Sequence, residues 1–595
     1  MPNSPFSRLF AWRILLAAAA FSIWGVTPVN ELHAQTAGTN STATKAYESG
    51  LTALHQGDLS SAQDEFERAV KLAPDNAEMQ MELGKVLLYR GDAGGAVTHL
   101  RAATKLKPNL AQAHFYLGQA LSAAGQFKEA IAELTEASKL APKEADPHRA
   151  LARVWSAQNK NTEAIAEART AVGLAPKSPE AHDELGTLLA QSGQIAEAET
   201  EFQTALQIDP QCQQAHFHLG VVWLNRGDAA KARKELGKAT ELNPKDGRAF
   251  YYLGDACQAA GDKDGAIAAY QEAATLLPDS PTVHTKLGLM LQRTTDVDGA
   301  ANAFRRVIEL TPNDADAHNN LGLVMMQRGE GEAAVKEFQE AVKLQPDDAD
   351  YRGNLGIAYM QLSDFDAAEQ HLRAAIKMSP DAASLHYDLA LTLKLKDNLP
   401  AAMAELKKAI ELDPKLVDAY YTYGITLWQQ GEFPAAVQQL RKAVELKPDY
   451  AEAYYTLGTV LKQMNQLPEA AQALREAIRL QPQFAGAHTT LAGVLRQMGD
   501  TAGADAESQL GETLVKQKIG RQGATFATNS GKRMLNAGDI DGAISQFRNA
   551  IKLSPSFAQA HYELAVALSR KGEKAEAASE FQKAADLDPK LKPVP

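Results

Sequence analysis

Prolines recur along this chain at a fixed interval of 34 residues, and this period constrains the fold more than any other feature. They stand at positions 74, 108, 142, 176, 210, 244, 278, 312, 346, 380, 414, 448 and 482, and Pro555 and Pro589 keep the interval after an offset. With each proline at position 32 of a repeat, sixteen repeats fit between residues 43 and 591. Such a period indicates one supersecondary unit that is stacked many times.

Each repeat carries two helical stripes of apolar and small residues. In repeat 9 (315–348), Leu321 and Met325 mark the first stripe, and Ala334 and Phe338 mark the second. Residues spaced by four lie on one face of a helix. The proline at position 32 cannot continue the second helix, because it lacks an N–H and clashes with the preceding turn. Each repeat is therefore predicted to be a pair of helices.

Small residues mark the turn and the contact between the two helices. Gly329 stands at position 15 of repeat 9, where a left-handed residue ends a helix. Eleven of the sixteen repeats have glycine there, and four others have Asn159, Ser363, Asp397 and Asn465. Position 8 is always Gly or Ala, and position 20 is always Ala, so the paired helices can approach closely. A single hairpin cannot bury its own apolar faces, so the repeats must stack.

Several fixed positions together carry a family resemblance. The markers of repeat 9 are Leu321, Gly322, Gly329, Glu330, Ala334, Phe338, Ala341 and Pro346. This set resembles the tetratricopeptide repeat, and the resemblance extends over residues 43–591. It implies an all-α fold, a right-handed solenoid or superhelix of sixteen helix-turn-helix repeats. It also implies proteins or peptides as partners.

Repeat 14 departs from the pattern. It has Ser508, Gly511 and Lys516 where a large apolar residue, an alanine and a proline are expected, and extra residues follow before repeat 15 begins. The proline-free run from about Thr501 to Ala537 predicts one or two long helices. We therefore expect fourteen repeats over 43–510, a helical joint over 511–523, two further repeats over 524–591 and a tail over 592–595.

The first residues predict export. Arg8 and Arg13 precede the apolar run ILLAAAAFSIWGV, and a short segment with small residues ends at Ala34. This layout is typical of a secretory signal peptide, here 1–34, followed by a flexible lead-in over 35–42. The apolar run is too short for a comfortable membrane span, although a retained N-terminal anchor stays open as an alternative. We expect a periplasmic or secreted protein with no integral membrane span after signal removal.

Charge and cysteine content narrow the partners. The formal net charge is −12, and phosphate contacts need clustered Lys and Arg, so we expect no nucleic-acid partner. The two cysteines, Cys212 and Cys257, stand more than one repeat apart, and we expect no disulfide between them. Cys212 is predicted to be a surface thiol in a turn, and Cys257 a small core residue.

The histidines are numerous but regularly placed. Nine of the fourteen occupy position 4: His114, His148, His182, His216, His284, His318, His386, His488 and His561. Equivalent atoms on neighbouring stacked helices lie about 10 Å apart, too far to share a metal ion. We interpret these histidines as partly buried packing residues. No catalytic motif stands outside the repeats, so we expect no enzyme activity, no catalytic residue, no metal and no cofactor.

The resemblance places positions 2, 5, 6, 9, 12 and 13 of the first helices on a concave wall that binds polypeptides. Aromatic side chains at position 5 and polar ones at position 6 supply anchors and hydrogen bonds. The candidate binding residues are Phe217, Tyr251, Asn320, Asn354, Tyr387, Asp388, Tyr421, Thr422, Tyr455 and Thr456. Asn320 and Asn354 resemble the start of the asparagine ladder of O-linked N-acetylglucosamine transferase. Packing of the aromatics and solvation of the polar residues stay open as alternatives.

Two functions follow from this sequence. The first is a non-enzymatic scaffold that binds polypeptide segments in the groove outside the cytoplasm. The second is a structural component of an envelope secretion, pilus or polysaccharide-export machine. In the second case the end repeats matter most, because no capping helix is expected beyond Phe581 and Ala584. Self-association through this uncapped C-terminal repeat is a further expectation.

Overall fold

The computed structural model describes residues 41–294 and 296–591, and every regular element within them is an α-helix. The all-α prediction is confirmed. Helix α2 (Ser41–His55) begins inside the predicted lead-in 35–42, so the last residues of that segment are helical rather than flexible. The predicted signal peptide 1–34 and the tail 592–595 lie outside the described residues.

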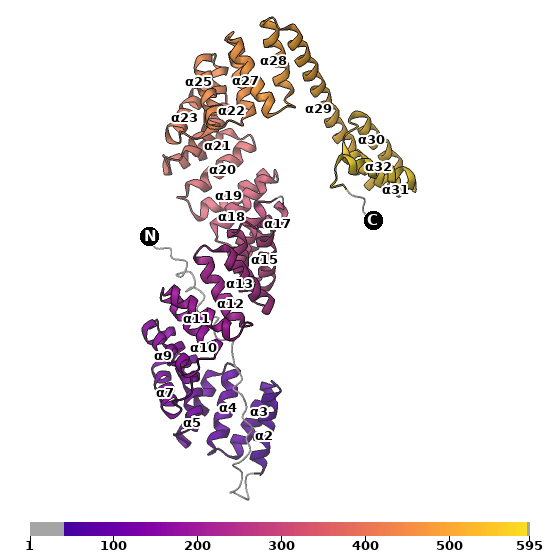
Figure 1. The fold of residues 1–595 in the computed structure, drawn as a ribbon. Helices are drawn as coiled ribbons and strands as arrows, with labels where there is room; N and C mark the ends of the chain where they lie inside the picture. The colour runs from indigo at the N-terminus through magenta and orange to yellow at the C-terminus, as the bar shows by residue number, and fades with distance from the viewer. Residues whose placement is uncertain (1–40, 295, 592–595) are drawn as a thin grey trace. The chain divides into compact units, whose positions relative to one another are not determined.

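The helices form two compact parts, the first ending at Pro312 and the second beginning at Asn313. The helices of the first part (Figure 1) are α2, α3 (Leu59–Leu72), α4 (Ala77–Tyr89), α5 (Ala93–Leu106), α6 (Ala111–Ala123), α7 (Phe127–Leu140), α8 (Asp146–Ala157), α9 (Asn161–Leu174), α10 (Pro179–Gln191), α11 (Ile195–Ile208), α12 (Gln213–Asn225), α13 (Ala229–Leu242), α14 (Gly247–Ala259), α15 (Lys263–Leu276), α16 (Pro281–Gln292) and α17 (Val297–Leu310).

The second part continues the same alternation of a first and a second helix per repeat. Its helices are α18 (Ala315–Gln327), α19 (Gly331–Leu344), α20 (Ala349–Gln361), α21 (Phe365–Met378), α22 (Ala383–Leu395), α23 (Leu399–Leu412), α24 (Val417–Gln429), α25 (Phe433–Leu446), α26 (Ala451–Gln463), α27 (Leu467–Leu480), α28 (Ala485–Gln497), α29 (Thr501–Asn536), α30 (Ile540–Leu553), α31 (Ala558–Lys571) and α32 (Lys574–Leu587).

The turn between paired helices follows the sequence prediction. Gly329 has a φ of 75°, a left-handed conformation that ends α18 before α19 begins. Four residues other than glycine adopt the same conformation at position 15: Asn159, Ser363, Asp397 and Asn465, with φ between 58° and 62°. All four were assigned to this turn from the repeat period alone, and that assignment is confirmed.

Small residues set the distance between paired helices. A Cβ added to Gly322 would lie 2.7 Å from Cε1 of Phe338, so the second helix packs directly on the backbone of the first. The alanine at position 20 is at most 3% exposed in every repeat, from Ala62 to Ala577. A larger residue at either place would force the two helices apart.

One helix breaks the alternation. Helix α29 has 36 residues and supplies both the second helix of repeat 14 and the first helix of repeat 15 without a turn between them. Figure 1 shows it as one continuous helix between α28 and α30. Gly511 in its first half lies against Thr489 of α28, and Gly531 in its second half lies against Phe547 of α30.

The middle of α29 has an exposed apolar stripe. Val515, Ile519 and Phe526 are 42%, 63% and 72% exposed, and their spacing places them on one side of the helix. In the other repeats, the first helix packs beside the second helix of the preceding repeat. Here the second helix of repeat 14 and the first helix of repeat 15 are parts of the single helix α29. The predicted joint 511–523 falls inside α29, and the division into arrays of fourteen and two repeats stays a prediction.

Two smaller predictions are corrected by the structure. Cys212 is buried, because it caps α12 and packs between Ala205 and Ala215, so its assignment as a surface thiol is wrong. Ala584, expected on an open apolar face, is fully buried at the contact between α31 and α32. Both cysteines are free thiols, and Cys257 fills the core as predicted. None of the described helices combines the length and the apolar character that a membrane crossing requires.

Candidate binding surface

The position-4 histidines are tied to a glutamate at position 23 of the same repeat. In repeat 3, Nδ1 of His114 lies 2.6 Å from Oε2 of Glu133. Seven further pairs have this contact at 2.5–2.7 Å: His148–Glu167, His182–Glu201, His216–Glu235, His318–Glu337, His386–Glu405, His488–Glu507 and His561–Glu580. These histidines connect the two helices of a repeat.

The other ring nitrogen ties the histidine to the preceding repeat. Nε2 of His114 lies 2.9 Å from the carbonyl oxygen of Pro108, and His386 has the same contact with Pro380 at 3.1 Å. A carbonyl only accepts, so Nε2 must donate. In repeat 6 the hydrogen bond between His216 and Glu235 raises the pKa of His216 and lowers that of Glu235.

These contacts revise the interpretation of the histidines. They are buried or half-buried as expected, but they are hydrogen-bonded links within and between repeats rather than packing residues alone. The sequence contained a signal for this role, because eight of the nine position-4 histidines have Glu at position 23, and only His284 faces Ala303. Within the described residues, no group of His, Cys, Asp and Glu is arranged to hold a metal ion.

We call the surface formed by positions 5, 6, 9 and 12 of consecutive first helices the first-helix wall. Along it, the position-6 side chain bonds to positions 5 and 9 of the preceding repeat. Glu184 in α10 accepts hydrogen bonds from Nε and Nη2 of Arg149 in α8 at 2.9 Å and 3.0 Å, and also pairs with Arg153. Burial alone would raise the pKa of Glu184, but the two arginines lower it.

Other repeats use different residues in the same arrangement. His218 lies 2.8 Å from Asp183, and Lys286 donates to Asp255 at 2.8 Å. In the second part, Nδ2 of Asn354 donates to Oδ1 of Asn319 at 2.8 Å, Tyr387 bonds to Thr422 at 3.4 Å, and Lys532 pairs with Glu563 at 3.1 Å. In these repeats the position-6 side chain is therefore paired with the preceding first helix.

Asp388, at position 6 of repeat 11, lacks this arrangement. The preceding repeat offers Gly353 at position 5 and Ile357 at position 9, and neither can donate from a side chain. Among the residues that the structure describes, no donor lies within hydrogen-bond distance of the Asp388 carboxylate, which is half-buried. Burial raises its pKa to about 6, and no neighbouring charge contributes.

Aromatic side chains surround this part of the wall. The rings of Tyr421 and Tyr450 have centroids 4.9 Å apart, and those of Tyr455 and Phe484 are 4.7 Å apart. Burial raises the pKa of Tyr387 above its ordinary value, and Asp418 and Asp388 contribute in the same direction. Repeats 11–13 therefore combine half-buried tyrosines with negative charge.

The predicted binding residues separate into two groups. Phe217, Thr422 and Thr456 are buried, and Thr456 donates to the carbonyl oxygen of Glu452. The remaining seven are half-buried: Tyr251, Asn320, Asn354, Tyr387, Asp388, Tyr421 and Tyr455. Asn354 is engaged by Asn319, so the proposed ladder of Asn320 and Asn354 is not a pair of equivalent free amides.

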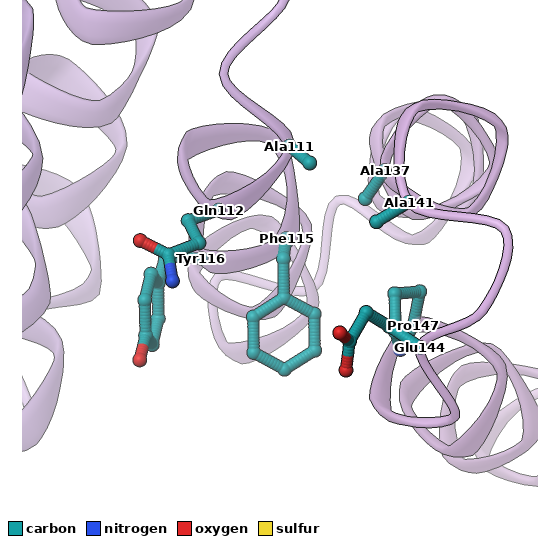
Figure 2. A pocket seen from close by; sticks show the side chains of 8 residues that line it. All are labelled: Ala111, Gln112, Phe115, Tyr116, Ala137, Ala141, Glu144 and Pro147. Carbon is teal, nitrogen blue, oxygen red and sulfur yellow. The ribbon is translucent and has the colours of Figure 1, made fainter. Parts of the chain in front are cut away.

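A small pocket lies in the first part beside Phe115, outside the predicted candidates. Its lining is Ala111, Gln112, Phe115, Tyr116, Ala137, Ala141, Glu144 and Pro147, from α6, α7, the turn between α7 and α8, and the first turn of α8. In Figure 2 the ring of Phe115 lies between Tyr116 on one side and Glu144 and Pro147 on the other. The largely apolar lining fits an apolar side chain rather than a charged ligand.

Comparisons with solved structures find helical repeat proteins at low similarity. The structure of the APC/C hetero-tetramer Cut9–Hcn1 shares 15% identity, with 76% of this chain and 96% of that chain covered and a TM-score of 0.35. Yeast Tom70 shares 17% identity over 81% and 98%, with a TM-score of 0.33. YrrB, described as a TPR protein with an unusual peptide-binding site, shares 23% over 30% and 93%, with a TM-score of 0.29. No curated protein matches the chain significantly.

Family models give a direct assignment. One tetratricopeptide repeat model matches residues 47–111, 184–241, 224–281, 285–349, 354–417 and 529–591, together more than half of the chain. Related repeat models match residues 87–154, 424–465 and 451–484. These matches coincide with the helix pairs, close glycine contacts and left-handed turns described above. The chain therefore belongs to the tetratricopeptide repeat family.

Proposed function

We propose that this protein is a non-enzymatic scaffold that binds polypeptide segments along the first-helix wall of repeats 10–13, formed by α20, α22, α24 and α26. The observation that carries this proposal is the stretch from Asp388 to Tyr455, where aromatic rings and a carboxylate are not fully used within the fold. Aromatic residues of this kind give large contact area at low entropy cost.

Other classes of function have less support. Eight of the nine position-4 histidines, which are residues well suited to acid–base chemistry, are engaged in structural pairs with glutamate, as His114 is with Glu133. The net charge of −12 disfavours a nucleic-acid partner. Export to the periplasm or the medium remains part of the proposal and rests on residues 1–34 of the sequence.

A peptide selection on the full chain tests the binding function. Peptides of about 12 residues from a random library would be selected on the protein, and their affinities measured by fluorescence anisotropy. Replacing Tyr421 and Tyr455 by alanine should weaken binding by roughly tenfold or more, because such anchors dominate interface energies. Tyr562→Ala, at the same position of repeat 16, is the matched control and should leave affinity unchanged. If no peptide is selected, or the control weakens binding equally, the assignment is wrong.

A second candidate, an assembly component of an envelope machine, is favoured by the apolar stripe of α29. Val515, Ile519 and Phe526 form an exposed surface on a helix that also carries Lys516 and Lys518. Large exposed apolar side chains of this kind are typical of protein interfaces. Under this candidate, Ile519→Ser with Phe526→Ser should release a neighbouring subunit, or lower the mass of self-associated protein in light scattering, while peptide binding at repeats 10–13 persists.

A further inference from the structure

At repeat 11 of the first-helix wall, a charged position-6 side chain has no partner on the preceding first helix. In other repeats a charged side chain at this position meets a residue of complementary chemistry there, as Glu184 meets Arg149 and Lys286 meets Asp255. At Asp388 the preceding first helix presents Gly353 and Ile357 instead. Neither side chain can donate a hydrogen bond to a carboxylate.

A group that pairs with Asp388 has to be a hydrogen-bond donor. A carboxylate accepts hydrogen bonds and cannot donate, so a neutral acceptor would not satisfy Asp388. Burial, together with Asp418 and Glu452 on the next two first helices, raises the pKa of Tyr450, whereas burial alone acts on Asp388. A half-buried carboxylate without an internal donor or cation is best matched by a cation.

The tyrosine rings of this part of the wall also favour a cationic side chain. Tyr387 precedes Asp388 on α22, and Tyr421 with Tyr450 lies one repeat further along the wall. Cations are attracted to the faces of such rings, and Lys447 already lies 4.6 Å from the centroid of the Tyr450 ring. A long basic side chain can place its methylene stem on these rings while its charged end reaches the carboxylate.

We propose that Asp388 is the docking point for a lysine or arginine side chain of the bound polypeptide segment. This side chain supplies the hydrogen-bond donor that Gly353 and Ile357 do not provide. This inference rests on the proposed function of the wall and specifies the partner: a segment with a basic residue. Within the chain, Lys532 paired with Glu563 at 3.1 Å shows the geometry of a position-9 lysine bonded to a position-6 carboxylate.

The experiment uses library-selected 12-residue peptides and the full chain. Each Lys or Arg of a selected peptide is replaced in turn by norleucine, which keeps length and removes charge. One replacement should weaken binding roughly ten- to a hundredfold, as expected for a lost hydrogen bond to a desolvated charge. Asp388→Asn should weaken the parent peptide by a similar factor and should have little effect on the norleucine peptide.

Two further variants separate docking from general charge and from folding. Asp381→Asn removes an exposed carboxylate in the turn before α22, outside the first-helix wall, and should leave affinity unchanged. Ile357→Lys supplies an internal cation to Asp388, as Lys532 does for Glu563, and should weaken cationic peptides while the helical circular dichroism is retained.

The outcomes are distinguishable. Peptides that bind tightly without Lys or Arg, or equal losses for Asp388→Asn and Asp381→Asn, would overturn the role of Asp388 and leave the scaffold function standing. If no peptide binds the full chain, both the docking point and the proposed function fail.

Discussion

Two stretches of the first-helix wall have the same backbone arrangement but opposite side-chain chemistry. In repeats 4 and 5, the carboxylate of Glu184 is enclosed by Arg149 and Arg153 from the preceding helix. In repeats 10 and 11, the carboxylate of Asp388 faces Gly353 and Ile357 and has no donor among the described residues. In the first stretch the carboxylate is paired within the fold, whereas in the second a half-buried carboxylate has no partner on the preceding first helix.

The comparison teaches that one position can serve stability in one repeat and recognition in another. A solenoid permits this because each repeat contacts mainly its neighbours, so an unfavourable local choice does not spread. Functional residues are often kept at some cost in stability. Removing the charge of Glu184 should therefore lower the free energy of unfolding, whereas removing the charge of Asp388 should raise it.

The largest effect is expected for Glu184→Gln. Arg149 is only 14% exposed and would lose both hydrogen bonds to an ionised partner. Arg149 keeps its hydrogen bond to Asp146, so the substitution should cost about 2 kcal/mol, within the range for hydrogen bonds to charged groups. Urea denaturation and hydrogen exchange of α8 and α10 measure this loss. Glu163→Gln, at an exposed glutamate of α9, is the control and should change the free energy of unfolding by less than about 0.5 kcal/mol.

Asp388→Asn should have the opposite sign. The folded-state pKa of about 6 lies above the unfolded value, so the folded chain holds this proton more tightly. The penalty of the buried carboxylate is thus absent at low pH and fully present above pH 6. We expect the substitution to stabilise the protein by about 1–2 kcal/mol at pH 8 and by little at pH 4. A destabilisation at pH 8 would show that Asp388 is satisfied within the fold.

The histidine pairs provide a smaller, pH-dependent effect. The raised pKa of His216 adds stability that is complete below its unfolded value and is lost as pH rises through the folded value. The lowered pKa of Glu235 adds stability that is lost as pH falls through its folded value. The pair should therefore contribute most between about pH 4.5 and 6.5.

His216→Gln tests this window. It should cost about 1 kcal/mol near pH 6 and less at pH 8, as measured by urea denaturation at several pH values. His284→Gln is the matched control, because Ala303 replaces the glutamate in that repeat and no pair exists. Equal pH profiles for the two variants would contradict the role of the histidine–glutamate pair.

The smallest expected effect comes from Asp397→Gly. Asp397 has a φ of 59°, which glycine adopts with less strain. The change should stabilise the second part by less than about 1 kcal/mol and leave peptide affinity unchanged. This variant therefore shows whether a change in stability near repeat 11 is enough to alter peptide affinity. A change of affinity in Asp397→Gly would weaken the inference drawn from Asp388→Asn.

The sequence predicted the features that depend on one repeat. The period located the helix pairs, and position 15 identified Ser363 and Asp397 as left-handed turn residues, because conformation there is local. Position 20 predicted the buried alanines for the same reason. The resemblance to a known family then supplied the surface on which to look for binding.

The sequence did not predict the side-chain contacts between neighbouring repeats. The bond from Asn319 to Asn354 spans 35 residues and depends on how neighbouring first helices are offset, which the period alone does not give. The buried state of Thr456 has the same cause. The glutamate partners of the histidines lie within one repeat, and comparing positions 4 and 23 across repeats would have found them.

The claim that Asp388 has no partner within the fold is tested most directly by titrating its carboxyl group by carbon-13 NMR in the full chain. The structure predicts a pKa of about 6 for the free protein, and a clear fall when a cationic peptide binds or when Ile357→Lys supplies a lysine. An aspartate pKa near its ordinary value in the free protein, unchanged by either cation, would mean that this carboxylate is already solvated or paired and that no docking point exists there.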